Sequence, residues 1–357
     1  MLQTLAALSI CVGWWTRTAS AVFFATFTWV ELLDKTNYLN HYYLVSLLAL
    51  LLVFMPAGRM LSVDALVSPS FKRTNGPAWV LWVMRAQIGL VYFFAGIGKL
   101  NSDWLLDAQP LRIWLGTTGE IPLVGWIFTQ TWMAWPMSWG GAIFDLAIPF
   151  VLCSKRFKWM GFVGLIAFHV VTRMMFLIGM FPWIMLVNVT LFLDSDWPLK
   201  WIRKQESQVE ELQVPRIWLL PVLLYGLFQI CFPLRRLCYD GNYLWHERGF
   251  RFSWNVMLIE KSGDAQFVLK DKVTGLERQV RNRDWLTPQQ ERMMSTQADM
   301  ILQFARFLAE KHPGNEVFGD VWVSWNGRSA ARFIKSDVDL AKVENVKDVC
   351  LEAPPKE

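Results

Sequence analysis

The chain has 357 residues, of which 54% are hydrophobic and 18% charged, and its net charge is +5. Soluble domains usually carry about 25% charged residues, so this composition excludes a protein that is soluble throughout. The basic residues flank apolar runs instead of forming a block, which excludes a nucleic-acid surface. The apolar residues concentrate before residue 233, and charges recur every few residues after Asp240. We therefore expect a membrane domain followed by a smaller soluble domain.

The N-terminus and the cysteines narrow the possibilities further. A cleaved signal peptide begins with basic residues, whereas Arg17 follows an apolar opening here. The abrupt start suggests an element before residue 1. The cysteines form no CxxC pair and no Cys/His cluster with zinc spacing, so we expect no metal site. These cysteines are Cys11, Cys153, Cys231, Cys238 and Cys350.

Apolar segments suited to crossing a bilayer follow one another through the first 233 residues. A helix needs about 20 apolar residues to cross, and shorter spans are accommodated by tilt or bilayer thinning. We predict an α-helical polytopic membrane bundle of about six or seven spans. Segment 180–193 follows its predecessor almost without a loop and has Pro182 in its first turn, which favours a tight hairpin or re-entrant piece. The candidate segments are 17–33, 41–55, 78–97, 132–153, 157–177, 180–193 and 215–233.

The distribution of Lys and Arg predicts the orientation, because basic residues in short loops favour the cytoplasmic side. If the spans alternate, the loops that contain Lys72 and 200–204 are cytoplasmic. Lys99, the loop 101–130 and the C-terminal domain are then outside the cytoplasm. Arg235 and Arg236, directly after the last span, favour the opposite orientation. We predict a multi-pass protein, in the inner membrane if the source is bacterial.

The last third of the chain has the pattern of a small, mainly β domain of α+β type. Turn signals at 262–264 and 274–275 separate short alternating runs, and Pro313-Gly314 ends a helical pattern. We expect a membrane domain at 1–235, an extramembrane domain at 236–347 and a disordered tail at 348–357. The expected strands are 251–260, 265–270, 276–280, 317–324 and 330–334, and the expected helix is 288–311.

Ionisable residues within the apolar segments are the first functional candidates, because charges in a bilayer are expensive and usually face a cavity. Lys99 ends an apolar run and could act as a base, or its amine could extend to the membrane interface. His41 begins a segment, so an interfacial histidine is the alternative. His169 and Asp145 lie within apolar helices, and Asp145 could form a structural ion pair with Arg173 or Arg85.

Four segments, in the same order, are similar to one known family. Residues 85–104 closely resemble the hallmark stretch of the vitamin K-dependent γ-glutamyl carboxylases. Residues 33–44 with 62–64, then 168–169 with 178–181, and finally 252–254 with Met257 resemble further blocks of that family. Bacterial relatives with the horizontally transferred transmembrane (HTTM) domain share the membrane core.

The resemblance implies an enzyme of the carboxy-lyase class that couples oxidation of a reduced quinone, to the epoxide, with carboxylation of peptide glutamate. Reduced vitamin K, a phylloquinone or menaquinone hydroquinone, would be the cofactor, and O2 and CO2 the co-substrates, with no metal. The partners would be a glutamate-containing peptide and the lipid bilayer. Lys99 corresponds to the base that deprotonates the hydroquinone, and His41 to the histidine that supports carboxylation. The residues expected at the substrate and quinone pocket are His169, Asp145, Arg85, Phe252 and Trp254.

Several positions depart from the family pattern. Thr172 occupies a position where asparagine is common, Arg173 one where a small polar residue is common, and Phe252 replaces a tyrosine associated with glutamate handling. The long C-terminal extension of the animal enzymes is also absent from this sequence. Two alternatives follow: a quinone-oxidising relative that acts on another carbon acid or on none, and a non-enzymatic quinone-binding membrane protein. A transporter would more often show two matching halves, which this sequence lacks.

Overall fold

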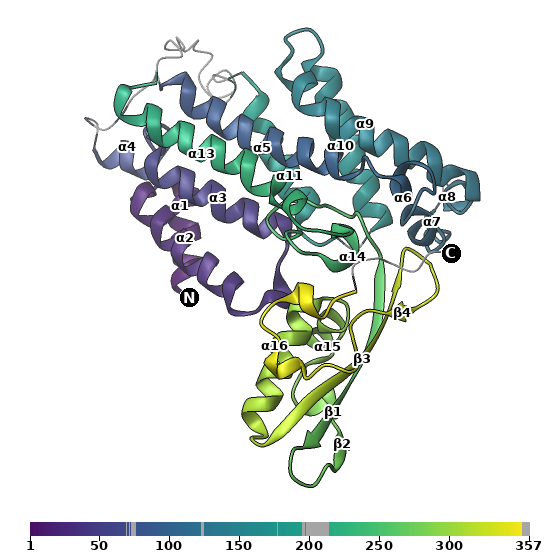
Figure 1. Cartoon of the computed structure of the whole chain (residues 1–357). Coiled ribbons are helices and arrows are strands. Elements are labelled where there is room, and N and C mark those ends of the chain that lie inside the picture. The colour runs from purple at the N-terminus through teal and green to yellow at the C-terminus, as the bar shows by residue number, and fades with distance from the viewer. Residues whose placement is uncertain are drawn as a thin grey trace. The chain divides into compact units, whose positions relative to one another are not determined.

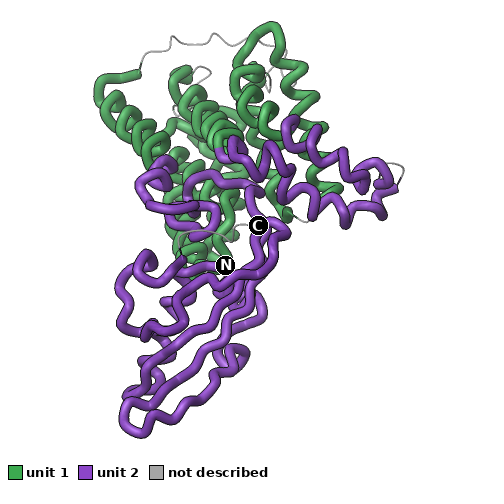
Figure 2. Tube along the Cα trace, turned by 45° about the vertical axis from the view of Figure 1, so that its right-hand side comes forward, with its two compact units in different colours: residues 1–97, 141–232 green, residues 98–140, 233–357 purple. Residues whose placement is uncertain are grey.

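The computed structural model describes residues 1–68, 70, 72, 76–122, 125–176, 178–194, 197 and 214–351 (Figure 1). It divides into two compact units (Figure 2). Unit 1 contains residues 1–97 and 141–232, and unit 2 contains residues 98–140 and 233–357. The segment that follows Lys99 therefore groups with the C-terminal part of the chain. The domain division at residue 235 stays a prediction, and the loop 200–204 lies outside the described residues.

Unit 1 is built from helices, and the seven expected apolar segments all coincide with helices. An additional helix, α1 (Leu2–Val12), was not predicted, because it is too short to be recognised as a span. A short helix α4 (Val63–Val67) follows α3. The helices at the expected segments are α2 (Thr16–Leu33), α3 (Asn40–Phe54), α5 (Ala78–Gly98), α9 (Ala134–Cys153), α10 (Lys158–Met175), α11 (Phe181–Val189) and α13 (Arg216–Leu234).

Among the described residues, three helical segments are long and apolar enough to cross a membrane: Ala78–Gly98, Thr131–Cys153 and Arg216–Cys238. Three further apolar helices are shorter: Leu2–Val12, Asn40–Phe54 and Phe181–Phe192. The structure thus confirms a mostly helical architecture with three candidate membrane spans. The expected number of six or seven stays a prediction.

The turn between α1 and α2 shows how the block at residues 62–64 contributes to unit 1. Gly13 ends α1 with a φ of 69°, and a Cβ there would lie 2.4 Å from Cβ of Ser62. Only glycine tolerates both that conformation and that approach. The carboxylate of Asp64 accepts hydrogen bonds from the backbone N–H groups of Trp15 and Thr16 at 2.9 and 3.3 Å. Asp64 therefore caps the start of α2 from a distant point in the sequence.

Unit 2 contains the small antiparallel sheet that the sequence predicts. Its strands are β1 (Lys261–Asp271), β2 (Glu277–Gln279), β3 (Asn315–Trp325) and β4 (Ala331–Arg332), in the order β2-β1-β3-β4. Every neighbouring pair is antiparallel. The helices α15 (Pro288–Met294) and α16 (Ala298–Lys311) lie against the sheet (Figure 1). Phe267 of β1 packs edge-on against Phe304 of α16, with ring centroids 5.1 Å apart.

The expected strand at 251–260 is wrong. Phe252, Trp254 and Met257 have φ values of 59°, 56° and 52°. These left-handed conformations interrupt an extended strand and are strained for residues with side chains. Alternating apolar residues produced the prediction, but the segment is an irregular loop between α14 (Tyr243–His246) and β1.

Two smaller expectations also change. The helix expected at 288–311 is interrupted at Ser295, where the chain passes from α15 to α16. Gly263 does not mark a turn, because it lies inside β1, where a Cβ would come within 2.6 Å of the Ser295 carbonyl oxygen. This glycine therefore permits the close approach of α15 to the sheet. The turn at 274–275 and the helix end before Pro313 are confirmed.

The remaining short elements of unit 2 lie in the segment after Lys99 and near the C-terminus. The former contains α6 (Ser102–Leu105), α7 (Leu111–Leu115) and α8 (Gly125–Phe128). Cys350, within the expected tail, forms an isolated β-bridge with Ile334. The indole N–H of Trp245 donates to the Leu351 carbonyl at 2.9 Å. Asp348 ends a short 3-10 helix, Val346–Asp348, and residues 352–357 of the expected tail lie outside the described residues.

Candidate functional site

Lys99 directly follows the last residue of α5 and is buried, with 6% of its surface exposed. Its Nζ lies 5.2 Å from the ring centroid of Trp104, a distance at which a cation and an indole attract each other. Asn101 forms the tight turn between the two residues. Its Oδ1 accepts from the Trp104 backbone N–H at 3.0 Å, and its Nδ2 donates to the Gly98 carbonyl at 2.8 Å. The capped turn thus holds the indole against the lysine.

Trp104 is itself held in place. Its indole N–H donates to the Ser138 carbonyl at 2.9 Å, and the Ser138 hydroxyl donates to the Trp104 carbonyl. Both residues are buried. A reciprocal pair of hydrogen bonds fixes the ring plane, so Lys99 faces a rigid aromatic surface.

The loop at 252–258 packs against the end of α5 beside Lys99. A Cβ on Gly98 would lie 2.7 Å from Cδ1 of Leu258 and 3.5 Å from Oδ1 of Asn255. Trp254, in the same loop, is completely buried. The structure therefore brings Lys99 together with the loop that contains Phe252 and Trp254, two of the expected pocket residues.

Two arginines after the last apolar helix shape that loop. Arg236 is buried, donates to Oδ1 of Asn255 and stacks on the Tyr243 ring at 4.8 Å. Arg235 donates to the Ser253 hydroxyl at 3.0 Å and to the Arg251 carbonyl. Sequence reasoning treated these two residues only as topology signals. Their bonds give them a structural role that charge counting could not reveal.

An acidic residue four positions after Lys99 connects the site to the sheet of unit 2. Asp103 is buried and accepts hydrogen bonds from Asn326 Nδ2 at 2.7 Å and from both terminal nitrogens of Arg328. The Arg328 guanidinium also lies over the Trp325 ring at 4.6 Å. Sequence reasoning missed this cluster, although Asp103 lies in the hallmark stretch and Asn326-Gly327 is a common turn dipeptide.

A second group of predicted residues meets in unit 1. His169 is completely buried, and its Nε2 lies 2.7 Å from the Tyr92 hydroxyl. The Phe181 ring lies between the two histidines, 5.9 Å from His41 and 5.6 Å from His169. Thr172, which replaces a common asparagine, donates its hydroxyl to the His169 carbonyl at 3.1 Å. His41 and His169 are therefore joined through one aromatic ring, and Tyr92 is a partner that the sequence did not suggest.

The two remaining charged candidates are placed differently. Asp145 is buried in α9. Arg85 donates to the carbonyls of Leu191 and Leu193 at 2.8 and 2.9 Å. Its guanidinium also lies 5.1 Å from the Trp82 ring. Arg85 thus closes the C-terminal end of the helical segment after α11, where unpaired carbonyls favour a cation.

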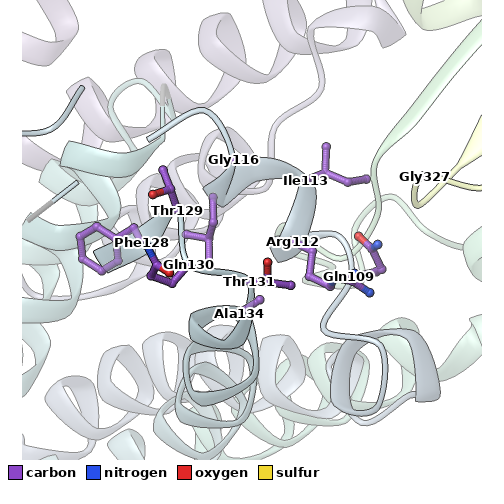
Figure 3. Close-up of a pocket in the computed structure, with 11 residues that line it drawn as sticks. Gln109, Arg112, Ile113, Gly116, Phe128, Thr129, Gln130, Thr131, Ala134 and Gly327 are labelled. Atoms are coloured by element: carbon purple, nitrogen blue, oxygen red, sulfur yellow. The ribbon is translucent and has the colours of Figure 1, made fainter. Parts of the chain in front are cut away.

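Unit 2 contains a mixed polar and apolar pocket of about 360 Å³ (Figure 3). Its lining residues are Gln109, Arg112, Ile113, Leu115, Gly116, Phe128, Thr129, Gln130, Thr131, Ala134 and Gly327. Unit 1 contains an apolar pocket of about 310 Å³ between α3, α5 and α13. It is lined by Leu50, Leu51, Phe54, Met55, Trp79, Val83, Trp218, Pro221, Val222 and Tyr225. The Tyr225 hydroxyl donates to Gln87 at 2.6 Å, and the other lining side chains are apolar, so this pocket is suited to hydrocarbon.

These features define a helical membrane protein with a buried lysine at a helix end and an α+β domain near its C-terminus. The HTTM domain family matches residues 1–197, and the chain belongs to this family. Residues 214–349 match the lumenal domain of the vitamin K-dependent gamma-carboxylases. Together the two matches relate the chain to the γ-carboxylase family. No solved structure matches the chain.

Proposed function

We propose that this protein is a vitamin K-dependent γ-carboxylase-like enzyme of the carboxy-lyase class. It would couple oxidation of a hydroquinone, to the epoxide, with carboxylation of glutamate in a peptide. The observation that carries the proposal is the burial of Lys99 against Trp104, within the stretch that resembles the family hallmark. An amine shielded from water suits a general base, because bulk water does not compete for the proton.

The residues around Lys99 fit a reduced vitamin K. A hydroquinone is a flat ring with two hydroxyl groups and an apolar side chain. Trp104 offers a flat aromatic surface, Leu258 offers an apolar contact beside the helix end, and Lys99 offers the base. When bound, the hydroquinone would react with O2 and supply the strong base that removes the γ-proton of glutamate, after which CO2 adds. In this proposal Lys99 accepts the hydroquinone proton and the aromatic wall excludes water.

The histidine pair has a separate role in the proposal. His41 supports the carboxylation step, and His169, bonded to Tyr92, fixes the ring of Phe181 beside it. Asp145 and Arg85 contribute to the shape of unit 1, and Phe252 and Trp254 to the glutamate side. A buried, hydrogen-bonded residue such as His169 orients a neighbouring reactive group without touching the substrate.

The same proposal extends to the membrane. The helices α2, α3 and α10 would add to the three candidate spans and give six, and α11 would give seven if it also crosses. The protein would lie in the inner membrane if its source is bacterial, with the C-terminal part outside the cytoplasm. Its partners would be the bilayer and a glutamate-containing peptide.

Two other functions compete with this one. Phe252, in the place of a tyrosine, favours a relative that oxidises the quinone and acts on another carbon acid or on none. A non-enzymatic quinone-binding protein would not require a buried base, so the burial of Lys99 favours an enzyme.

The deciding experiment uses purified protein in lipid nanodiscs with reduced vitamin K, labelled bicarbonate and a glutamate-rich peptide. Epoxide and peptide label are measured separately. We expect both products from the wild-type protein and neither from Lys99→Ala, with partial rescue by a small amine. Lys311→Ala, on the exposed end of α16, is the matched control and should keep both activities. Epoxide without label would leave only the quinone-oxidising relative, and normal epoxide formation by Lys99→Ala would eliminate the proposed base.

A further inference from the structure

The pocket of unit 2 is assembled from segments far apart in the sequence. Gln109 and Arg112 come from the region of α7, Thr129 and Thr131 from the chain after α8, and Gly327 from the turn between β3 and β4. Figure 3 shows Gln109, Arg112 and Gly327 on one side of the pocket, and Phe128, Thr129 and Gln130 on the other. Its volume of about 360 Å³ is in the range of pockets that hold small ligands.

The chemistry of the lining favours an anion. Arg112 is the one ionisable residue among the described lining residues, and the remaining polar groups are amides and hydroxyls. Its guanidinium stacks on the Trp135 ring at 5.3 Å, which orients the group without neutralising its charge. Within the described part of the chain, Arg112 forms no ion pair. A guanidinium binds carboxylate and phosphate groups through two parallel hydrogen bonds.

A second polar atom at the pocket, Oε1 of Gln109, lacks a hydrogen-bond donor among the described residues. This oxygen is buried. A buried acceptor without a partner is costly, so a ligand that brings a donor would be favoured there. A carboxylate for Arg112 together with an N–H for Gln109 is the combination that an acidic peptide offers. A phosphate group would satisfy the first requirement and not the second.

The position of Gly327 keeps the pocket open. Its φ is 79°, and a Cβ there would lie 3.4 Å from Ile113 Cδ1 and 3.7 Å from Gln109 Nε2. The residues on either side of it, Asn326 and Arg328, are the two that bind Asp103. The backbone N–H of Gln109 donates to the Asp103 carbonyl at 2.8 Å. The pocket is therefore built on the same loop that follows Lys99.

We infer that this pocket binds an acidic segment of the polypeptide substrate, separate from the glutamate that reacts. Arg112 would hold a side-chain carboxylate, and Gln109 Oε1 would accept a backbone N–H of the peptide. The inference rests on the proposed function only in naming a peptide as substrate. An acidic peptide held there would be retained near the Lys99 loop, which would favour substrates with several acidic residues.

The test measures direct binding, so it does not depend on turnover. A fluorescent glutamate-rich peptide and its glutamine counterpart are titrated with the 357-residue protein in phosphatidylcholine nanodiscs, and anisotropy gives the dissociation constants. Arg112→Gln should weaken binding of the glutamate peptide about tenfold or more, as expected for a charge-assisted hydrogen bond, and leave the glutamine peptide unchanged. Gln109→Leu should weaken both peptides. Arg281→Gln, an exposed arginine of the same unit, is the matched control and should change neither.

Three results would overturn the inference. The first is equal affinity of the wild-type protein for the two peptides. The second is an equal effect of Arg112→Gln and Arg281→Gln. The third is competition by phosphatidylglycerol that depends on Arg112, without discrimination between the peptides, which would identify a lipid headgroup as the ligand. Failure of the proposed function is distinguishable, because Lys99→Ala would then form epoxide normally while the effect of Arg112 on peptide affinity persisted.

Discussion

Arg328 donates two hydrogen bonds to the carboxylate of Asp103, from Nη1 to Oδ2 at 2.8 Å and from Nη2 to Oδ1 at 3.1 Å. The two residues are 225 positions apart in the sequence. Asp103 is adjacent to Trp104, whose ring faces Lys99, so the bidentate pair connects the turn after β3 to the candidate base. An arginine fork suits this task, because its geometry fixes direction as well as distance.

Removing one member of this pair should destabilise the protein. Arg328→Met leaves a buried carboxylate without its partner, and we expect the free energy of unfolding to fall by roughly 3–5 kcal/mol. The double variant Asp103→Asn with Arg328→Met removes both charges and should recover a large part of that loss. Thermal unfolding in detergent measures both effects. Equal destabilisation of the single and double variants would show that the unpaired charge is not the cause.

The two glycines before Lys99 should respond differently to alanine. A Cβ on Gly96 would lie 2.9 Å from the backbone nitrogen of Leu146, which cannot move without shifting α9. A Cβ on Gly98 would meet only side-chain atoms of Leu258 and Asn255. We therefore expect Gly96→Ala to cost about 1–3 kcal/mol of unfolding free energy and Gly98→Ala distinctly less.

A matched rescue separates the two glycine effects. Leu258→Ala should relieve Gly98→Ala, because it removes the side chain that the new Cβ meets. Leu146→Ala should relieve Gly96→Ala only in part, because it removes the Cγ and Cδ2 atoms at 2.7 and 2.9 Å while the backbone nitrogen at 2.9 Å remains. Thermal unfolding of the four single and two double variants provides the comparison, and full rescue of both glycine variants, or of neither, would contradict the contacts described here.

The stability of unit 2 should depend on pH through His246. Burial, followed by the positive charge of Arg248, lowers the pKa of His246 from 6.5 to about 4. A histidine with a lowered pKa in the folded state binds its proton more readily when unfolded, so stability falls as the pH falls from about 6.5 towards 4. Hydrogen exchange of residues 243–260, measured at pH 7 and pH 5, reports the change. His246→Asn, which can still accept from the Arg248 backbone N–H, should reduce the pH dependence, whereas His312→Gln should not.

The sequence predicts the helices of unit 1 well because apolar length is a local property that survives without tertiary context. It misjudges residues 251–260, where alternating apolar residues favour a strand but Arg235 and the buried Arg236 hold an irregular loop. It also predicts a loop at 101–130, whereas the structure has short helices there that group with the C-terminal part. Lys99 and His41 were identified from the family resemblance and from the energetic cost of placing ionisable groups in a bilayer. The partners Asp103, Arg328 and Tyr92 depend on contacts between distant positions, which no local pattern encodes.

His41 provides the test that separates the two enzymatic functions. If carboxylation is retained, His41→Ala should lower the label in the peptide much more than it lowers epoxide formation, because the histidine acts after the strong base has formed. Loss of both activities together would indicate a structural role, which is physically reasonable because His41 is buried against Phe181.

Phe252→Tyr provides a complementary test: restoring the hydroxyl should lower the KM for the glutamate peptide if the peptide contacts this loop. A wild-type protein that forms epoxide without peptide label, together with no effect of Phe252→Tyr, would exclude peptide carboxylation and leave quinone oxidation as the function.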